Sequence, residues 1–168
     1  MSIPIYEVRA RQYSELFGIT IDFAKPLGHG NDGQVWKTNQ LTAVKVLERE
    51  RKYALELECY RRIADAGVNR IGGFAVPKLM GFSDEHWGVE MEIVSPPYVI
   101  DFAKVWLDDP PDFDAEVLED ADRKGSELFE RKWPEVRTLL WTLQNRFGIY
   151  YTDPNAGNIT FRDWKPSL

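Results

Sequence analysis

Residues 27–47 read LGHGNDGQVWKTNQLTAVKVL, and this stretch decides the fold. Gly28, Gly30 and Gly33 have the spacing G-x-G-x-x-G. In a dinucleotide-binding turn such glycines begin a helix, whose N-terminus receives the pyrophosphate. Here they are followed by 34–47, which consists of two β-type runs separated by polar residues. The stretch therefore predicts a glycine-rich β-hairpin and a further strand, and it argues against a Rossmann turn.

Strand-type patterns continue on both sides of this stretch. Residues 19–23 alternate apolar and polar side chains ahead of it. Residues 75–80 and 88–94 are two later strand candidates, joined by the turn-like residues 83–86. The first 95 residues are therefore expected to hold five strands, with one helix inserted after the third.

Helical periodicity marks that inserted helix and one more. Gly67 stands where the C-terminal cap of the inserted helix belongs, and Pro134 and Gly148 stand at the expected start and end of the later helix. Residues 5–17 carry scattered apolar side chains and are expected to form a short helix as well. The apolar stripes consist of Tyr53, Leu57, Tyr60 and Ala64 in the inserted helix, and of Val136, Leu139, Leu140, Leu143 and Phe147 in the later one.

An acidic segment precedes the later helix. Residues 108–122 contain eight Asp or Glu side chains and no basic one. We expect a solvated linker or the start of an exposed helix, because charge runs are usually solvated. The alternative is an acidic docking surface for a basic partner.

The composition excludes several classes of protein. The chain has 168 residues, of which 27 are acidic and 21 basic, and this net charge of −6 argues against general nucleic-acid binding. With one cysteine, Cys59, and two histidines, neither an internal disulfide nor a zinc cluster is expected. No signal peptide or apolar run of roughly 18 residues is recognisable, so we expect a cytoplasmic protein without a membrane span.

A lysine follows the glycine hairpin at a position suited to phosphate binding. A hairpin that covers phosphates predicts an apolar residue two positions after its last glycine, which is Val35, and a lysine on the next strand, which is Lys45. This lysine needs a carboxylate on the following helix, and Glu56 and Glu58 point about 200° apart there. Glu56 is favoured because the apolar Cys59, Tyr60 and Ile63 place it beside the buried face.

The ordered set of motifs resembles the protein-kinase-like superfamily, which includes small-molecule kinases such as the aminoglycoside phosphotransferases. The chain is more similar to these bacterial small-molecule kinases than to eukaryotic protein kinases. The resembling segments span residues 27–158 and are 27–35, Ala43-Val44-Lys45, Glu56, Met91-Glu92-Ile93-Val94 and 153–158.

The resemblance implies a binding site for ATP. Leu27, Val35 and Ala43 would enclose the adenine, with Met91 at the back of the pocket. The backbone of Glu92 and Val94 would bond the adenine edge, Gly28, Gly30 and Gly33 would cover the phosphates, and Lys45 held by Glu56 would neutralise them.

The resemblance also implies a catalytic loop with a Mg²⁺ ligand. Asp153 and Asn158 match its D-x-x-x-x-N spacing, which makes Asp153 the base that orients or deprotonates the acceptor hydroxyl and Asn158 a Mg²⁺ ligand. On local grounds alone, residues 153–155 read as a turn. The loop departs from protein kinases in lacking the His and Arg that precede this aspartate.

The second metal ligand is a further departure. Asp163, followed by tryptophan, is the one candidate, but it comes five residues after Asn158, whereas the family places this aspartate well downstream. Five extended residues span roughly 16 Å, too far for two ligands of one metal without a sharp turn.

We therefore expect an α+β protein with a two-lobed, protein-kinase-like fold. Residues 1–95 would form an N-lobe with a five-stranded antiparallel sheet and one packed helix, and residues 96–168 a truncated, helical C-lobe. The expected function is transfer of the γ-phosphoryl group of ATP, with Mg²⁺, to a hydroxyl acceptor that the sequence does not name.

Two alternatives remain open. One is a pseudokinase-like module that binds a nucleotide or a protein without turnover. The other is a half-site completed by a second copy or a partner chain that covers the reduced C-lobe, and apolar surface near Trp133, Trp141 and Trp164 would favour it. For Trp133 and Trp141 the simpler interpretation is core packing.

Overall fold

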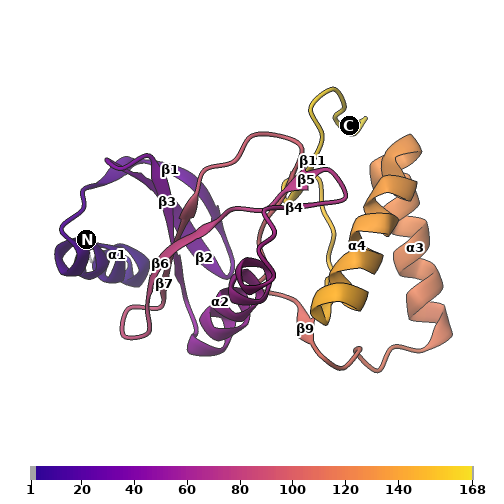
Figure 1. Cartoon of the computed structure of the whole chain (residues 1–168), viewed down its shortest axis with the longest axis horizontal. Helices are drawn as coiled ribbons and strands as arrows, with labels where there is room; N and C mark the ends of the chain where they lie inside the picture. The colour runs from indigo at the N-terminus through magenta and orange to yellow at the C-terminus, as the bar shows by residue number, and fades with distance from the viewer. Residues whose placement is uncertain (1–2, 168) are drawn as a thin grey trace. The chain divides into compact units, whose positions relative to one another are not determined.

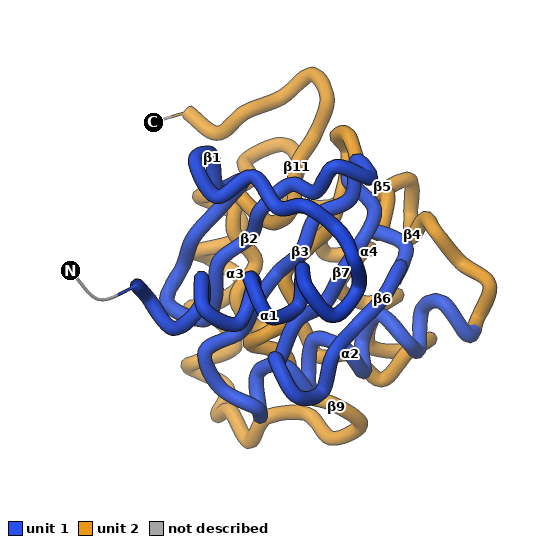
Figure 2. The backbone as a smooth tube through the Cα atoms, turned by 90° about the vertical axis from the view of Figure 1, so that its left-hand side faces the viewer, with its two compact units in different colours: residues 1–65, 77–93 blue, residues 66–76, 94–168 orange. Residues whose placement is uncertain are grey.

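A computed structural model describes residues 3–167 of the chain. The structure divides into two compact units, coloured separately in Figure 2. Unit 1 consists of residues 1–65 and 77–93, and unit 2 of residues 66–76 and 94–168. Within residues 3–167, no helix has both the length and the apolar composition that a membrane crossing requires.

Unit 1 is built on a five-stranded antiparallel sheet in the order β1-β2-β3-β7-β6 (Figure 1). Every neighbouring pair in it is antiparallel. The strands are β1 (Ile21–Gly30), β2 (Gly33–Thr38), β3 (Thr42–Leu47), β6 (Leu79–Ser83) and β7 (Gly88–Glu92). The α+β class and the five-stranded antiparallel sheet predicted from the sequence are thereby confirmed.

Two of these strands differ from the prediction in extent. β1 continues beyond residue 23 through the first two glycines to Gly30, with irregular register on the way. The predicted strand 75–80 begins only at Leu79, because Pro77 has no N–H to donate to a ladder. Ala75 instead belongs to β5 in a different sheet.

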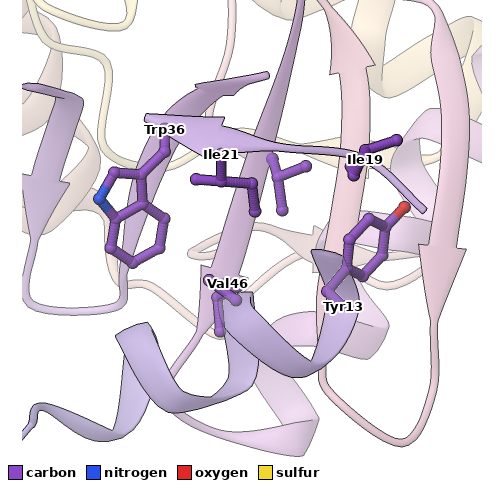
Figure 3. Packing of buried hydrophobic residues seen from close by; sticks show 7 residues of the cluster. Tyr13, Ile19, Ile21, Trp36 and Val46 are labelled. Atoms are coloured by element: carbon purple, nitrogen blue, oxygen red, sulfur yellow. The ribbon is translucent and has the colours of Figure 1, made fainter. Parts of the chain in front are cut away.

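Two helices cover opposite faces of the sheet, whereas the sequence predicts one packed helix. Val44 and Val46 of β3 lie in a buried cluster with Tyr13 of α1 (Ile5–Phe17), which Figure 3 shows from close by. Lys45 between them instead reaches α2 (Glu50–Asp65). Because successive strand residues point to opposite faces, α1 and α2 cover the two sides.

The docking of α1 depends on glycines in the sheet. A Cβ at Gly88 would lie 2.7 Å from a ring carbon of Tyr13, and one at Gly81 would lie 3.0 Å from its hydroxyl oxygen. The Tyr13 hydroxyl donates to the carboxylate of buried Glu90 at 3.2 Å. The two glycines therefore make room for an aromatic ring whose polar end is satisfied inside the unit.

Unit 2 combines a helical pair with short strands. α3 (Ala115–Phe129) and α4 (Trp133–Phe147) lie side by side, joined by the 3₁₀ turn Glu130–Lys132 (Figure 1). Pro134 lies in the first turn of α4, and Gly148 ends it with a φ of 65°, as predicted. The predicted stripe of α4 is buried, apart from half-buried Leu140, and its buried members are Val136, Leu139, Leu143 and Phe147.

The other segments of unit 2 are connected by two small sheets, whose strands are two residues long. A four-stranded sheet has the order β11-β8-β5-β4, and a second sheet pairs β9 with β10. These strands are β4 (Arg70–Ile71), β5 (Phe74–Ala75), β8 (Tyr98–Val99), β9 (Trp106–Leu107), β10 (Ile149–Tyr150) and β11 (Ile159–Thr160).

The division between the units follows these pairings. The break at residues 93/94 lies close to the expected boundary after residue 95. Residues 66–76, expected in the N-lobe, belong to unit 2 because β5 pairs in parallel with β8 and the Ala75 N–H donates to the carbonyl of Pro97.

The second half of the acidic segment lies in a helix. α3 is an exposed helix whose Asp114 caps the N–H of Val117, which confirms the expectation for residues 108–122.

The tryptophans singled out in the sequence differ in burial. Trp133 is buried against Gly125, where a Cβ would lie 2.2 Å from its ring. Trp164 packs on Phe129 and Phe161. Trp141, by contrast, is 65% exposed, so its predicted core packing is wrong.

Candidate functional site

The predicted glycine hairpin is present in unit 1. β1 and β2 are joined by a two-residue turn at Asn31-Asp32, and Gly30 is paired with Gly33 across it. Lys52 of α2 lies 3.7 Å from the Asp32 carboxylate, and the Glu48 N–H donates to the Asp32 carbonyl. The turn is therefore anchored on the side of α2.

The packing of the fold requires glycine at one of the three hairpin positions and not at the other two. A Cβ at Gly33 would lie 2.4 Å from the carbonyl oxygen of Val46, so packing against β3 requires glycine there. A Cβ at Gly28 or Gly30 would meet nothing within 4 Å, and neither residue has a left-handed backbone. The fold itself thus has no need of glycine at these two positions, which leaves room for a group from outside to approach the backbone.

Lys45 forms a buried ion pair with Glu56. The distance between Lys45 Nζ and Glu56 Oε2 is 2.6 Å, and the two residues are 7% and 0% exposed. Glu58 instead pairs with Arg62 one helical turn later, at 2.9 Å. Helix α2 therefore presents Glu56 to Lys45, as its apolar stripe indicates. A buried charge pair is costly to form, and removing one partner typically destabilises a fold by about 3–5 kcal/mol.

Residues predicted to enclose an adenine lie on the same sheet face as Lys45. Val35 is the register partner of Lys45, and Ala43 is the partner of Met91, so these side chains share the face that α2 covers. The hydroxyl of Tyr60 in α2 contacts the Met91 sulfur at 3.5 Å. Ala43 and Met91 are buried, and Val35 is half-buried.

The other residues predicted to contact the adenine are Leu27, Glu92 and Val94, and they are not part of this group of side chains. Leu27 is in β1 and is 53% exposed. The N–H of Glu92 already donates to the carbonyl of Lys78, at 2.9 Å. Val94 is the first residue of the second segment of unit 2.

The catalytic-loop-like segment of unit 2 follows β10 and is organised by Asn155. Its side-chain oxygen accepts from the N–H groups of Gly157 and Asn158, at 3.0 and 3.1 Å. The N–H groups of Asn158 and Ile159 donate in addition to its backbone carbonyl. Asn155, rather than Asp153, therefore forms the turn that the local sequence predicts.

A polar pocket brings Asp153 and Asn158 together within unit 2. Lys104 Nζ lies 3.5 Å from Asp153 Oδ2, and Asn158 Nδ2 donates to Asp101 Oδ2 at 3.2 Å. The pocket is lined by Asp101, Lys104, Val105, Tyr151, Thr152, Asp153, Asn155 and Asn158.

Sequence reasoning missed Asp101 and Lys104. The pairing of β8 with β11 brings the chain around residue 100 against the loop at residue 158, and two paired residues leave no periodic signal. The positive φ of Asp101, +67°, is likewise a property of the folded backbone and has no signature in the sequence.

Asp163 is exposed and is not among the residues that line this pocket. Extended β11 separates it from Asn158, and Trp164 beside it packs on Phe129. Among residues 3–167, no group of three or more His, Cys, Asp or Glu side chains is arranged to hold a metal ion. Mg²⁺ is commonly held by one or two carboxylates together with substrate phosphates, so a Mg²⁺ site requires fewer protein ligands than such a group provides.

Comparisons with known proteins find similarities among solved structures. No family model and no curated protein matches the chain. Among solved structures, the chain is similar to APH(2")-IIa in its ternary complex with streptomycin and ATP, with 17% sequence identity and a TM-score of 0.42. The likeness covers 86% of this chain and 41% of that one, so this chain spans about two-fifths of the length of that protein.

Proposed function

We propose that this chain is a kinase-like phosphotransferase that uses ATP and Mg²⁺ and transfers the γ-phosphoryl group to a hydroxyl acceptor. The observation that carries the proposal is the buried Lys45–Glu56 pair on the strand that follows a glycine hairpin. The carboxylate of Glu56 holds the ammonium group of Lys45 in a defined direction, which suits it to neutralise phosphates.

The residues of unit 1 fit a nucleotide. Gly28 and Gly30 leave the space above the hairpin open, so phosphate oxygens can approach the backbone there. Val35, Ala43 and Met91 supply apolar surface on the sheet face of Lys45, which suits a base ring.

The residues of unit 2 fit the acceptor side of the reaction. Asp153 is exposed, with Lys104 beside it, and would accept the proton of the acceptor hydroxyl. The acceptor oxygen then forms a bond to the γ-phosphorus, and the bond from that phosphorus to the bridging oxygen breaks to release ADP.

Asn158 lines the same pocket and would offer Mg²⁺ its amide oxygen, a ligand of the kind that this ion prefers. Asp163, outside this pocket, remains the second ligand predicted from the sequence. When bound, the ion would neutralise charge on the transferring group.

The second candidate is a nucleotide-binding module without turnover. It is favoured by one observation, that Asp163 does not line the pocket that contains Asn158. A third arrangement, a site completed by another copy or a partner chain, draws support from the exposed ring of Trp141.

Calorimetric titration of ATP, with and without Mg²⁺, tests the proposal. Lys45 alone is a poor position to change, because a buried Glu56 would be left without its cation. The double variant K45M/E56M replaces both charges by apolar groups, and K165M, at an exposed lysine of unit 2, is the control. Mg²⁺-dependent binding that is lost in the double variant and kept in K165M supports the proposal, provided thermal melting finds both folded.

Other outcomes discriminate between the candidates. Binding that is indifferent to Mg²⁺ favours the module without turnover. Binding that K45M/E56M leaves unchanged overturns the assignment of the phosphate site, and an absence of binding in the unmodified chain overturns the enzyme proposal itself.

A further inference from the structure

Two segments of unit 2 that are far apart in sequence are joined by several bonds around the polar pocket. β8 pairs with β11, and the Ile100 N–H donates to the carbonyl of Asn158 at 2.9 Å. The Tyr151 hydroxyl donates to the Ile100 carbonyl at 2.8 Å, and the Thr152 hydroxyl contacts the carbonyl of Lys104 at 3.3 Å. Backbone atoms of residues 100–104 are therefore bonded to one backbone carbonyl and two side-chain hydroxyl groups on the other side, which fixes their position relative to the loop.

Asp101 is held firmly inside this frame. Its φ of +67° is a left-handed conformation, which aspartate and asparagine tolerate better than most residues. One carboxylate oxygen, Oδ1, accepts from the N–H of Ala103 at 3.4 Å. The other, Oδ2, accepts from the side chain of Asn158 at 3.2 Å. Each oxygen of Asp101 thus faces a defined donor.

This contact determines which way the amide of Asn158 is turned. A carboxylate can only accept hydrogen bonds, so the Asn158 group that faces Asp101 has to be the NH₂. The amide oxygen then points away from Asp101. An asparagine with no such neighbour could turn its amide by 180° at little cost, because the two ends are nearly the same size.

We propose that Asp101 is a positioning residue, which keeps the amide oxygen of Asn158 on the side where a divalent cation binds. This inference rests on the proposed function, in which Asn158 is a cation ligand. Partners that orient a metal ligand typically contribute about 10- to 100-fold in metal affinity. Asp101 would therefore matter to the cation without touching it.

The variant D101N separates this role from a role in folding. Asparagine keeps the shape of aspartate and also tolerates a positive φ. Its oxygen can still accept from the Ala103 N–H, which leaves its NH₂ group facing Asn158. Two NH₂ groups cannot bond each other, so the amide of Asn158 turns its oxygen inward, away from the cation.

A reciprocal exchange distinguishes orientation from charge. In D101N/N158D, the NH₂ of residue 101 donates to the carboxylate of residue 158, which leaves an oxygen on the cation side again. D153N removes one negative charge from the same pocket without altering the Asp101–Asn158 contact. D109N, at an exposed position of unit 2, is the control for charge outside the pocket.

The experiment measures the Mn²⁺ dissociation constant of the full chain saturated with a non-hydrolysable ATP analogue. The readout is the paramagnetic broadening of backbone amide signals at residues 155–159. We expect D101N to weaken Mn²⁺ binding about tenfold or more, and D101N/N158D to restore it to within about threefold of the unmodified chain. The ¹⁵N side-chain signals of Asn158 are expected to shift in D101N while the rest of the spectrum keeps its dispersion.

The two proposals fail in different ways. If N158A weakens Mn²⁺ binding but D101N does not, Asp101 has no positioning role and the proposed function stands. A D101N variant that is weakened only as much as D153N, and that the exchange does not rescue, also rejects the positioning role. If N158A leaves Mn²⁺ binding unchanged, Asn158 is not a ligand and that part of the proposed function is rejected.

Discussion

The ammonium group of Lys104 lies 3.5 Å from a carboxylate oxygen of Asp153, and both side chains are about half exposed. An ion pair at this exposure contributes little to stability, typically below about 1 kcal/mol. We therefore expect the ion pair to act mainly by orienting the carboxylate of Asp153, the proposed base.

The variant K104M is expected to leave stability nearly unchanged and to lower turnover. Without the ammonium group, the Asp153 carboxylate samples more orientations, and we expect kcat to fall on the order of tenfold. ADP release with water as acceptor measures turnover without knowledge of the natural acceptor. K165M, at an exposed lysine of the same unit, is the control. Equal turnover in K104M and K165M would remove Lys104 from the site.

The variant D153N tests the base itself. Loss of general-base assistance typically lowers a rate by about 10²- to 10⁴-fold, while ATP binding should remain, because the proposed nucleotide contacts lie in unit 1. Turnover is again followed as ADP release, and ATP affinity by calorimetry. A variant that binds ATP and turns it over at the unmodified rate would sink the assignment of Asp153.

The hairpin glycines are expected to separate into two classes when each is changed to alanine. G33A forces a methyl group against the backbone carbonyl of Val46, and we expect a loss of about 1–3 kcal/mol in the free energy of unfolding. G28A and G30A meet open space, so their stability should stay level or rise slightly.

The affinity for ATP is expected to fall in the two variants whose stability is unchanged, G28A and G30A. A methyl group at residue 28 or 30 occupies the space that phosphates would use, so ATP binding should weaken while urea unfolding finds the fold intact. Unchanged ATP affinity in both G28A and G30A would contradict a phosphate site at the hairpin.

Alkaline pH is expected to destabilise unit 1 through Tyr13. Burial, and secondarily the charge of Glu90, raises the pKa of the Tyr13 hydroxyl above its usual value of 10.0. A group whose pKa is raised on folding stabilises the fold fully below its unfolded pKa, and this contribution is lost as the pH rises toward the folded pKa. The free energy of unfolding should therefore fall steadily above about pH 10.

The variant Y13F measures that contribution. At pH 8 it should lose about 1 kcal/mol, because a buried hydrogen bond to Glu90 is removed. Above pH 10 its stability should fall less steeply than that of the unmodified chain. Urea unfolding at pH 8 and pH 11 gives both values, with Y150F as the control. Parallel pH profiles for Y13F and the unmodified chain would exclude Tyr13 as the cause.

Local sequence predicted those parts of the fold that local physics controls. The turn at Asn31-Asp32 follows from glycine spacing, and the choice of Glu56 over Glu58 follows from counting residues around a helix. The caps at Pro134 and Gly148 follow in the same way.

Two of the missed features depend on contacts between residues that are far apart in sequence. Asp101 reaches Asn158 because a two-residue strand at 98–99 pairs with another at 159–160, and such short strands have no period to detect. The packing of α1 rests on Tyr13 and Glu90, which are 77 residues apart in sequence. The Pro77 break does have a signal in the sequence, since proline has no N–H to donate to a neighbouring strand.

The excursion of residues 66–76 into unit 2 affects how this protein can change over evolutionary time. The chain passes between the units three times, after residues 65, 76 and 93, so neither unit is a continuous stretch of the gene. Recombination at residue 93 would carry away β8 and β11 and leave β4 and β5 behind without their sheet. Neither unit can therefore be exchanged as a cassette, and the two are inherited together.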